Sequence, residues 1–257
     1  MTLLEKKAIL RVALYAGEIM LRNGAETYRV EDTIKRICKS RNLKHVSSFV
    51  TPTGIFISDD RFDGISFIKR VKSRTINLNK ISKVNDFSRE FVNSNISIKD
   101  AIMQLRKIDK IAKYPKFVRV LSAGFASSFF ALLFGANFSD FVAAFIISMV
   151  AVLISSKIEK VSQTAFLSNT AGGAIIAILS IFFHTVGVGA SIDMVIVGSI
   201  MPLLPGVALT NGLRDFISGD LISGVSRVSE AILIAISIAV GVGSILNVWI
   251  NVFGGAI

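Results

Sequence analysis

Long apolar runs dominate the second half of the chain. Five stretches after residue 116 are almost entirely apolar, and most approach the roughly 20 residues that a helix needs to cross a bilayer. They cover residues 117–136, 141–155, 165–183, 191–209 and 228–249. The pattern predicts a membrane α-helical bundle of about five transmembrane helices, in a domain of residues 117–257.

The first 116 residues show shorter apolar periods. Predicted amphipathic helices cover residues 3–21 and 27–41, and two more begin after the capping residues Asn77 and Ser97. Predicted strands cover residues 46–50, 55–58 and 65–71. The pattern predicts a small cytoplasmic α+β domain of residues 1–116 with a short antiparallel sheet.

Charge separates the two halves further. The chain is 52% hydrophobic and only 18% charged, whereas soluble domains average about 25% charged residues. Residues 1–116 hold 24 of the 29 Lys and Arg residues and 12 of the 18 Asp and Glu residues. The two halves therefore face different solvents. Because the first residues lack a secretory signal pattern, we expect the basic half in the cytoplasm.

The basic residues of the membrane half predict its orientation. Lys157 and Lys160 lie between the second and third predicted spans, and Arg214 and Arg227 lie between the fourth and fifth. Positively charged loops stay inside, so we expect a multi-pass cell-membrane protein with a cytoplasmic N-terminus and an external C-terminus. The basic stretch at 106–119 favours anionic lipid over nucleic acid, because no nucleic-acid-binding motif accompanies it.

Few residues could support catalysis or cofactor chemistry. The chain has one cysteine, Cys38, and two histidines, His45 and His184, far apart in the sequence. This composition argues against an intramolecular disulfide and a Cys- or His-rich metal site. The sequence has neither a Walker-type loop nor a Gly-x-Ser-x-Gly elbow. We expect no metal, no cofactor, no nucleic-acid partner and no enzymatic activity.

The fourth predicted span carries two helix-breaking residues three positions apart. Pro202 and Pro205, followed by Gly206, should open this helix inside the bilayer. The amides at the start of the new half-helix could bind a carboxylate, and the polar side chains of Thr210 and Asn211 follow at once. The break is either a solute site or a packing kink.

Ionisable residues follow this break. Asp215, Asp220 and Glu230 are acidic, and Arg214 and Arg227 are basic. Ionisable groups inside a membrane are costly and indicate a functional site, such as the carboxylate of a proton-coupled transporter. The alternative interpretation is a set of structural ion pairs at the membrane interface.

A third group of charges surrounds the start of the second predicted helix. Glu26, Arg29 and Glu31 could together bind a zwitterionic solute. They could equally cap that helix and dock the domain.

Several motifs resemble one family along nearly the whole chain. They are RNGAETYRVE at 22–31, TPTG at 51–54, RTINL at 74–78, PGVALTN at 205–211, RD at 214–215, GDL at 219–221, SG at 223–224 and Arg227 with Glu230-Ala231. These segments are similar to the signatures of the threonine/serine exporter family. The resemblance implies export of a small amino acid or, in some split systems, a dicarboxylate such as succinate. Some members fuse two five-span halves, and this chain resembles the larger subunit of the split form.

The first hypothesis is therefore a secondary exporter, or an exporter subunit, for threonine, serine or a similar small carboxylate. A dicarboxylate exporter subunit is the nearest alternative. A membrane-bound hydrolase or a membrane-tethered sensor are alternatives of another class. A single five-span half also predicts a second small membrane subunit or a homo-oligomer, with the lipid membrane and a small-molecule substrate as the other partners.

Overall fold

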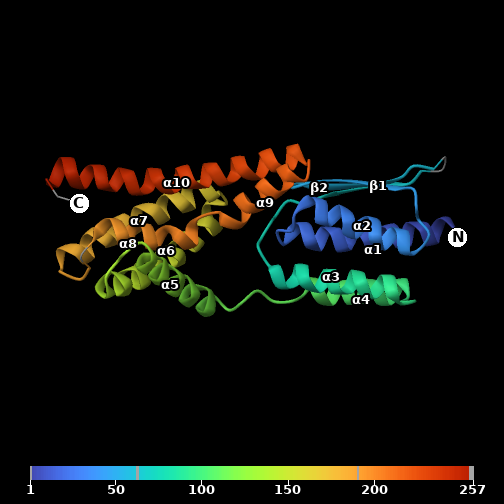
Figure 1. Ribbon diagram of the computed structural model, residues 1–257, viewed down its shortest axis with the longest axis horizontal. Helices are drawn as coiled ribbons and strands as arrows, with labels where there is room; N and C mark the ends of the chain where they lie inside the picture. Colours follow the sequence, from blue (N-terminus) through green and yellow to red (C-terminus); the bar gives the residue numbers. More distant parts are fainter. Residues whose placement is uncertain (1, 62–63, 190, 255–257) are drawn as a thin grey trace. The chain divides into compact units, whose positions relative to one another are not determined.

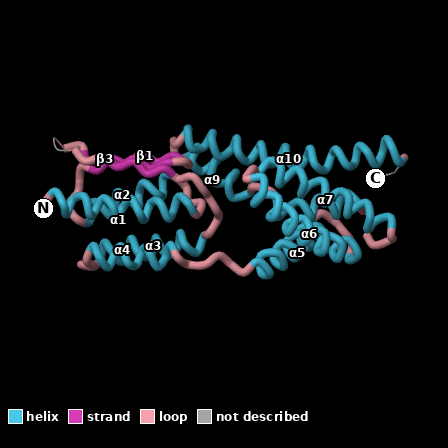
Figure 2. Tube along the Cα trace, turned by 180° about the vertical axis from the view of Figure 1, so that it is seen from behind, coloured by secondary structure: helices cyan, strands magenta, loops and turns pink. Residues whose placement is uncertain are grey.

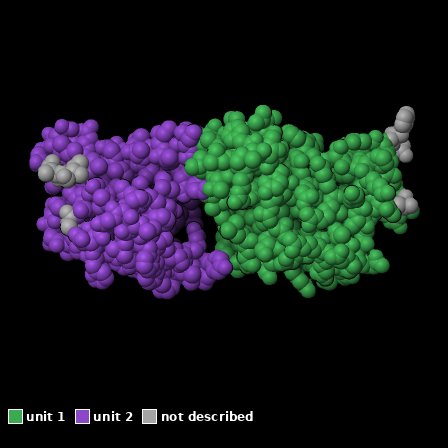
Figure 3. Space-filling view, in the orientation of Figure 1, with its two compact units in different colours: residues 1–113, 207–229 green, residues 114–206, 230–257 purple. Residues whose placement is uncertain are grey.

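The computed structural model describes residues 2–61, 64–189 and 191–254. The chain forms two compact units (Figure 3). Unit 1 contains residues 1–113 and 207–229, and unit 2 contains residues 114–206 and 230–257. The cytoplasmic domain of residues 1–116 stays a prediction; unit 1 adds the segment 207–229 to most of it.

Unit 1 has its elements in three layers, with the sheet on one side of α1 and α2 and the pair α3 and α4 on the other (Figures 1 and 2). Its four N-terminal helices are α1 (Leu3–Arg22), α2 (Thr27–Ser40), α3 (Leu78–Asn93) and α4 (Ile98–Asp109). Predicted caps form, since the side chains of Asn77 and Ser97 accept hydrogen bonds from the amides of Lys80 and Asp100. Helix α4 ends at Asp109, and Pro115 occupies the N-cap position of the following helix.

The predicted antiparallel sheet is confirmed. It contains β1 (Val46–Thr51), β2 (Gly54–Asp59) and β3 (Ser66–Arg70) in the order β1-β2-β3. Thr51 pairs with Gly54, so the first hairpin turns through Pro52 and Thr53, where a proline needs no ladder hydrogen bond.

Unit 2 supplies most of the apolar helices, α5 (Lys116–Leu133), α6 (Phe138–Ser162), α7 (Ala165–Thr185) and α8 (Ile192–Ile200). The last helix, α10 (Leu221–Phe253), has its first residues in unit 1 and the rest in unit 2. By length and composition, four of the described helices could cross a membrane, or up to five if the interrupted pair Ile192–Leu203 and Gly206–Ile217 forms one span. The predicted helical membrane class is confirmed at this level.

The predicted break in the fourth apolar run is present. Helix α8 ends at Ile200, a 3-10 turn covers Met201–Leu203, Leu204 is extended, and α9 (Gly206–Ile217) begins immediately after Pro205. The two prolines lack amide donors and cannot continue the helical hydrogen-bond pattern. The new helix therefore begins at the predicted residue.

Candidate functional site

The candidate site surrounds a tight turn between α1 and α2. Helix α1 ends at Arg22, and Gly24 then adopts φ +92°, a backbone conformation that side-chain-bearing residues rarely take. Glu26 occupies the position before α2, and Thr27 is its first residue. We refer to residues 24–27 as the hinge turn. Helix starts leave backbone N–H groups without partners inside the helix, so this turn needs acceptors from elsewhere.

Residues 211–227, in and after α9, hold every residue of the hinge turn. The amide Nδ2 of Asn211 donates to the carbonyl of Gly24 at 2.8 Å, and Arg227 donates to the carbonyl of Ala25 at 2.7 Å. Arg214 donates to Glu26 at 2.8 Å. These contacts join residues almost 190 positions or more apart in the sequence.

Asp215 lies at the centre of this arrangement. Its Oδ1 accepts from both the backbone amide and the hydroxyl of Thr27, at 3.1 and 2.9 Å. Its Oδ2 forms an ion pair with Nε of Arg227 at 3.1 Å. The angles between these two groups fall outside the range of a hydrogen bond. Asp215 is completely buried. A carboxylate from α9 thus caps α2, where the helix dipole favours negative charge.

A second carboxylate shares the Thr27 hydroxyl. Asp220 lies in the short turn between α9 and α10, with its Oδ2 3.3 Å from Oγ1 of Thr27. The amide of Asp220 donates to the carbonyl of Asp215 at 2.9 Å, which closes this turn. One carboxylate from α9 and one from the turn after it therefore converge on one hydroxyl.

Glu26 is engaged by two arginines. Arg214 and Arg29 lie 2.8 and 3.2 Å from its two carboxylate oxygens. Burial alone would raise the pKa of Glu26, but its backbone hydrogen bond, the hydrogen bond from Arg214 and the two positive charges together lower this pKa below the ordinary value of 4.5. Glu26 is therefore an ionised, paired carboxylate.

Glu31 connects α2 to the sheet. Its Oε1 accepts a hydrogen bond from the amide of Val50 at 2.9 Å, and Nζ of Lys35 lies 3.8 Å from its Oε2. Burial raises the pKa of Glu31 above 4.5, and the nearby charge of Asp220 adds to this effect. Glu31 therefore borders the same acidic region from the side of β1.

The remaining predicted site residues lie at the start of α9, along α9 and on α10. Pro205 and Gly206 form the start of α9, and the side of Gly206 that would carry a Cβ faces open space among the described residues. Thr210 is exposed on α9, and Glu230 lies on α10 in unit 2. Arg214 pairs with Glu26, and Asp215 pairs with Arg227. A solute-binding role for the seven predicted solute-site residues and a coupling role for the five predicted ionisable residues stay predictions.

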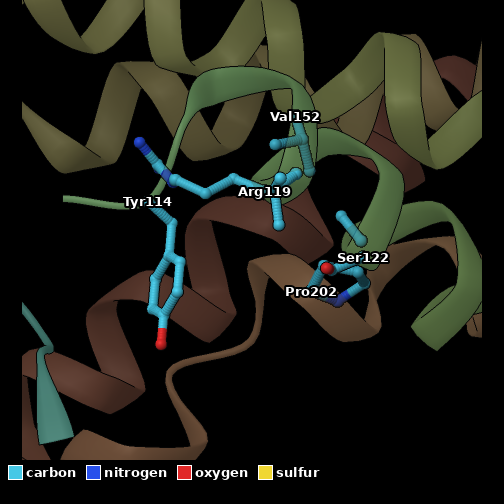
Figure 4. A pocket seen from close by; sticks show the side chains of 7 residues that line it. Tyr114, Arg119, Ser122, Val152 and Pro202 are labelled. Atoms are coloured by element: carbon cyan, nitrogen blue, oxygen red, sulfur yellow. The ribbon is translucent and has the colours of Figure 1, made fainter. Parts of the chain in front are cut away.

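Unit 2 contains a separate pocket of about 540 Å³ (Figure 4). It is lined by Tyr114, Val118, Arg119, Ser122, Ala123, Val152 and Pro202. Figure 4 shows Ser122 beside Pro202, with Arg119 and Tyr114 at the other side of the pocket. Within the described residues, no group of three or more His, Cys, Asp or Glu side chains could hold a metal ion.

Comparison with known proteins decides the family. The sequence model of the threonine/serine exporter family, ThrE, matches residues 11–249. The chain belongs to the threonine/serine exporter family. It is therefore a membrane exporter by family, and the resemblance of its motifs is confirmed.

Relatives of this family member differ in length. The "Probable succinate transporter subunit YjjP" of Klebsiella aerogenes is 24% identical over 95% of both chains. The "Threonine/serine exporter" of Corynebacterium glutamicum is 22% identical, over 91% of this chain but only 50% of that protein. The "Probable threonine/serine exporter" of Mycobacterium tuberculosis is 19% identical, over 93% and 46%. No solved structure matches the chain.

Sequence reasoning missed two groups in this exporter-family chain. Thr27 is the residue on which Asp215 and Asp220 converge, and it lies inside the first family motif between two selected charges. A hydroxyl at the first position of a helix, with no acidic cap of its own, was the available signal. Arg119 was interpreted only as part of the basic stretch before the first span, because sequence does not show that it borders a pocket.

Proposed function

We propose that this chain is one subunit of a secondary exporter for a small carboxylate-bearing solute, with threonine, serine and succinate as the candidates. Family membership supports the export function, and the printed names of the relatives supply the candidate solutes. We further propose that a proton gradient drives export. The observation that carries this coupling is the hydroxyl of Thr27 shared by Asp215 and Asp220.

A hydroxyl group has one hydrogen to donate. When both carboxylates are ionised, Thr27 satisfies Asp215 or Asp220, but not both. One proton added to this pair of carboxylates lets the protonated carboxyl group donate to Thr27, so that all three groups are satisfied. Proton uptake therefore changes how firmly the hinge turn is held by residues 211–227, which is the two-state element that coupled transport requires.

The broken fourth span is the proposed place of the solute. The start of α9 follows Pro205 directly, so the positive end of this helix dipole lies beside the break. This arrangement suits a carboxylate. Glu26, Arg29 and Glu31 are then proposed to position the hinge turn, since each already has a partner within unit 1.

A second subunit completes the proposal. The relative that matches this chain over nearly its full length is named a transporter subunit, whereas the relatives named as exporters are about twice as long. We propose assembly with a small membrane partner or a second copy, with the N-terminus in the cytoplasm and the C-terminus outside.

Transport by proteoliposomes tests the proposal. The purified chain is reconstituted alone and with its candidate partner, and efflux of labelled threonine, serine and succinate is measured with and without a pH gradient. We expect pH-driven efflux of at least one solute, lost in Asp220→Asn and kept in the control Asp86→Asn, an exposed carboxylate of α3. Hydrolysis of a substrate without transport would favour the enzyme alternative, and tight solute binding without transport would favour the sensor.

Restoring a regular helix tests the place of the solute. The double variant Pro205→Ala, Gly206→Leu should insert normally but lose efflux. Wild-type efflux from this variant would show that the break is only a packing kink.

A further inference from the structure

The pocket of unit 2 combines one cation with apolar walls. Arg119 and Ser122 lie three residues apart on α5, a spacing that places two side chains on the same helix face. Val118, Ala123 and Val152 supply aliphatic surface, and Pro202 brings the broken fourth span to the pocket. Its volume of about 540 Å³ falls within the range of small-molecule sites.

Arg119 has no acidic partner in the described part of the chain, since none of the ion pairs there includes it. A guanidinium group presents parallel N–H donors that match the two oxygens of a carboxylate. A carboxylate that binds Arg119 in this pocket would therefore come from outside these residues.

A buried hydroxyl beside the same break adds an independent observation. Ser155 lies one turn beyond Val152 on α6 and is 5% exposed, and its hydroxyl has no hydrogen-bond partner among the described residues. A Cβ placed on Gly172 would lie 2.4 Å from this hydroxyl and 2.9 Å from Leu203, which follows Pro202. Buried hydroxyls are almost always satisfied, so Ser155 is a second polar group near Pro202 whose partner is not among the described residues.

We propose that this pocket is the inner binding site of the transported solute, in which Arg119 binds the carboxylate and Ser122 a hydroxyl, amino or second carboxylate group. The proposal rests on the proposed export function. A short-chain acid with a second polar group fits this lining, because Arg119 and Ser122 offer two polar positions and the aliphatic walls can contact the carbon atoms between them.

Cysteine protection measures this binding directly. Val118→Cys places a thiol in the pocket, while the native Cys38 is buried and burial raises its pKa to about 12, so it reacts slowly with maleimide. Alkylation is followed in nanodiscs of neutral phosphatidylcholine with succinate or threonine added. We expect at least one solute to slow it. Arg119→Gln should raise the solute concentration for half-protection about tenfold to a hundredfold, as expected for a lost charge-assisted hydrogen bond.

Two matched variants keep the result interpretable. Lys116→Gln removes a cation one turn away that does not line the pocket, and it should leave protection unchanged. Arg119→Lys keeps the charge without the paired donors, so its solute concentration for half-protection should lie between those of the parent and Arg119→Gln. This partial retention also distinguishes a loss of binding from misfolding. Equal protection in Arg119→Gln and the parent would overturn the proposal.

Lipid phosphate offers the same oxyanion chemistry. If phosphatidylglycerol slows alkylation through Arg119 while no solute does, the pocket is a lipid site and the proposal is wrong. The two hypotheses fail in different ways. Protection without efflux would contradict the exporter hypothesis but not the binding site. Efflux that Arg119→Gln does not slow would contradict the binding site but not the exporter hypothesis.

Discussion

The two units differ in how they distribute large apolar side chains. In unit 1 the large residues Phe91, Leu10 and Leu105 are fully buried. In unit 2 alanines such as Ala143 and Ala151 share the interior with isoleucines, while other large residues such as Leu133, at 77% exposure, point outward. Water drives large apolar groups inward, but lipid does not, so small residues at helix contacts determine packing. The exposed residues thus reveal the solvent of each unit.

Their buried polar groups differ as well. Unit 1 buries an ion pair, Asp215 with Arg227, that joins parts of the chain distant in sequence. Unit 2 uses hydroxyls that donate to backbone carbonyls of a neighbouring helix, such as Ser128 to Phe141 and Ser168 to Ser155, each at 2.8 Å. Ionic contacts determine which segments meet in unit 1, whereas short hydroxyl contacts only join adjacent helices in unit 2.

Removing the buried carboxylate of unit 1 should have the largest effect. Asp215→Ala leaves Arg227 and the start of α2 without their counter-charge and should destabilise the protein by about 3–5 kcal/mol. Equilibrium unfolding of the purified protein in detergent measures this loss. The control Asp32→Asn breaks an exposed pair with Arg36 and should cost less than about 1 kcal/mol. Similar losses in both variants would contradict the prediction.

A matched pair of leucines tests the assignment of solvents. Leu233 in unit 2 and Leu4 in unit 1 are both exposed, at 59% and 78%. Leu233→Asp should reduce membrane integration, because a carboxylate near the middle of a span costs about 2.5–3.5 kcal/mol. Leu4→Asp should change stability by less than about 0.5 kcal/mol. Membrane integration is measured as the fraction of protein that resists alkaline extraction. Equal integration of Leu233→Asp and Leu4→Asp would show that Leu233 does not face lipid.

Close helix packing in unit 2 predicts a somewhat smaller effect. A Cβ on Gly241 would lie 2.1 Å from the carbonyl oxygen of Thr170, whereas one on Gly243 meets nothing within 4 Å in the described structure. Gly241→Val should therefore destabilise the protein by about 1–3 kcal/mol, the usual cost of overpacking. Thermal unfolding in detergent measures it. Gly243→Ala, on the same helix, should leave the midpoint unchanged or raise it slightly; a loss as large as that of Gly241→Val would be inconsistent with this contact.

The smallest expected effects concern two glutamates of unit 1, whose ionisation should change the stability of the fold with pH in opposite directions. The lowered pKa of Glu26 means that the unfolded state binds more protons near pH 4.5, so this stabilisation is present above 4.5 and is lost as pH falls through the folded pKa. The raised pKa of Glu31 has the opposite effect, and its stability contribution falls as pH rises above 4.5.

Unfolding midpoints measured against pH test both signs. At neutral pH, Glu26→Gln should destabilise the protein, and Glu31→Gln should be neutral or slightly stabilising, because a glutamine can still accept from the amide of Val50. A shift of the same sign in both variants would refute the assignment.

Periodicity predicted the local elements well. The strands, the capping residues Asn77 and Ser97, and the break before Gly206 all follow from apolar spacing, turn chemistry and proline, which act over a few residues. The long-range contacts could not be predicted this way. No local rule pairs Thr27 with Asp215, or places residues 207–229 with the N-terminal helices, because these contacts depend on packing between distant segments.

Unit 1 combines two segments that are distant in the sequence, so its contacts form in a definite order during synthesis. The amide of Thr27 emerges from the ribosome 188 residues before its acceptor on Asp215, which at about 5–20 residues per second amounts to roughly 10–40 s. Throughout that interval the amide of Thr27 lacks the acceptor that it has in the finished chain. The N-terminal unit therefore reaches its complete hydrogen bonding only after most of the membrane part has been synthesised.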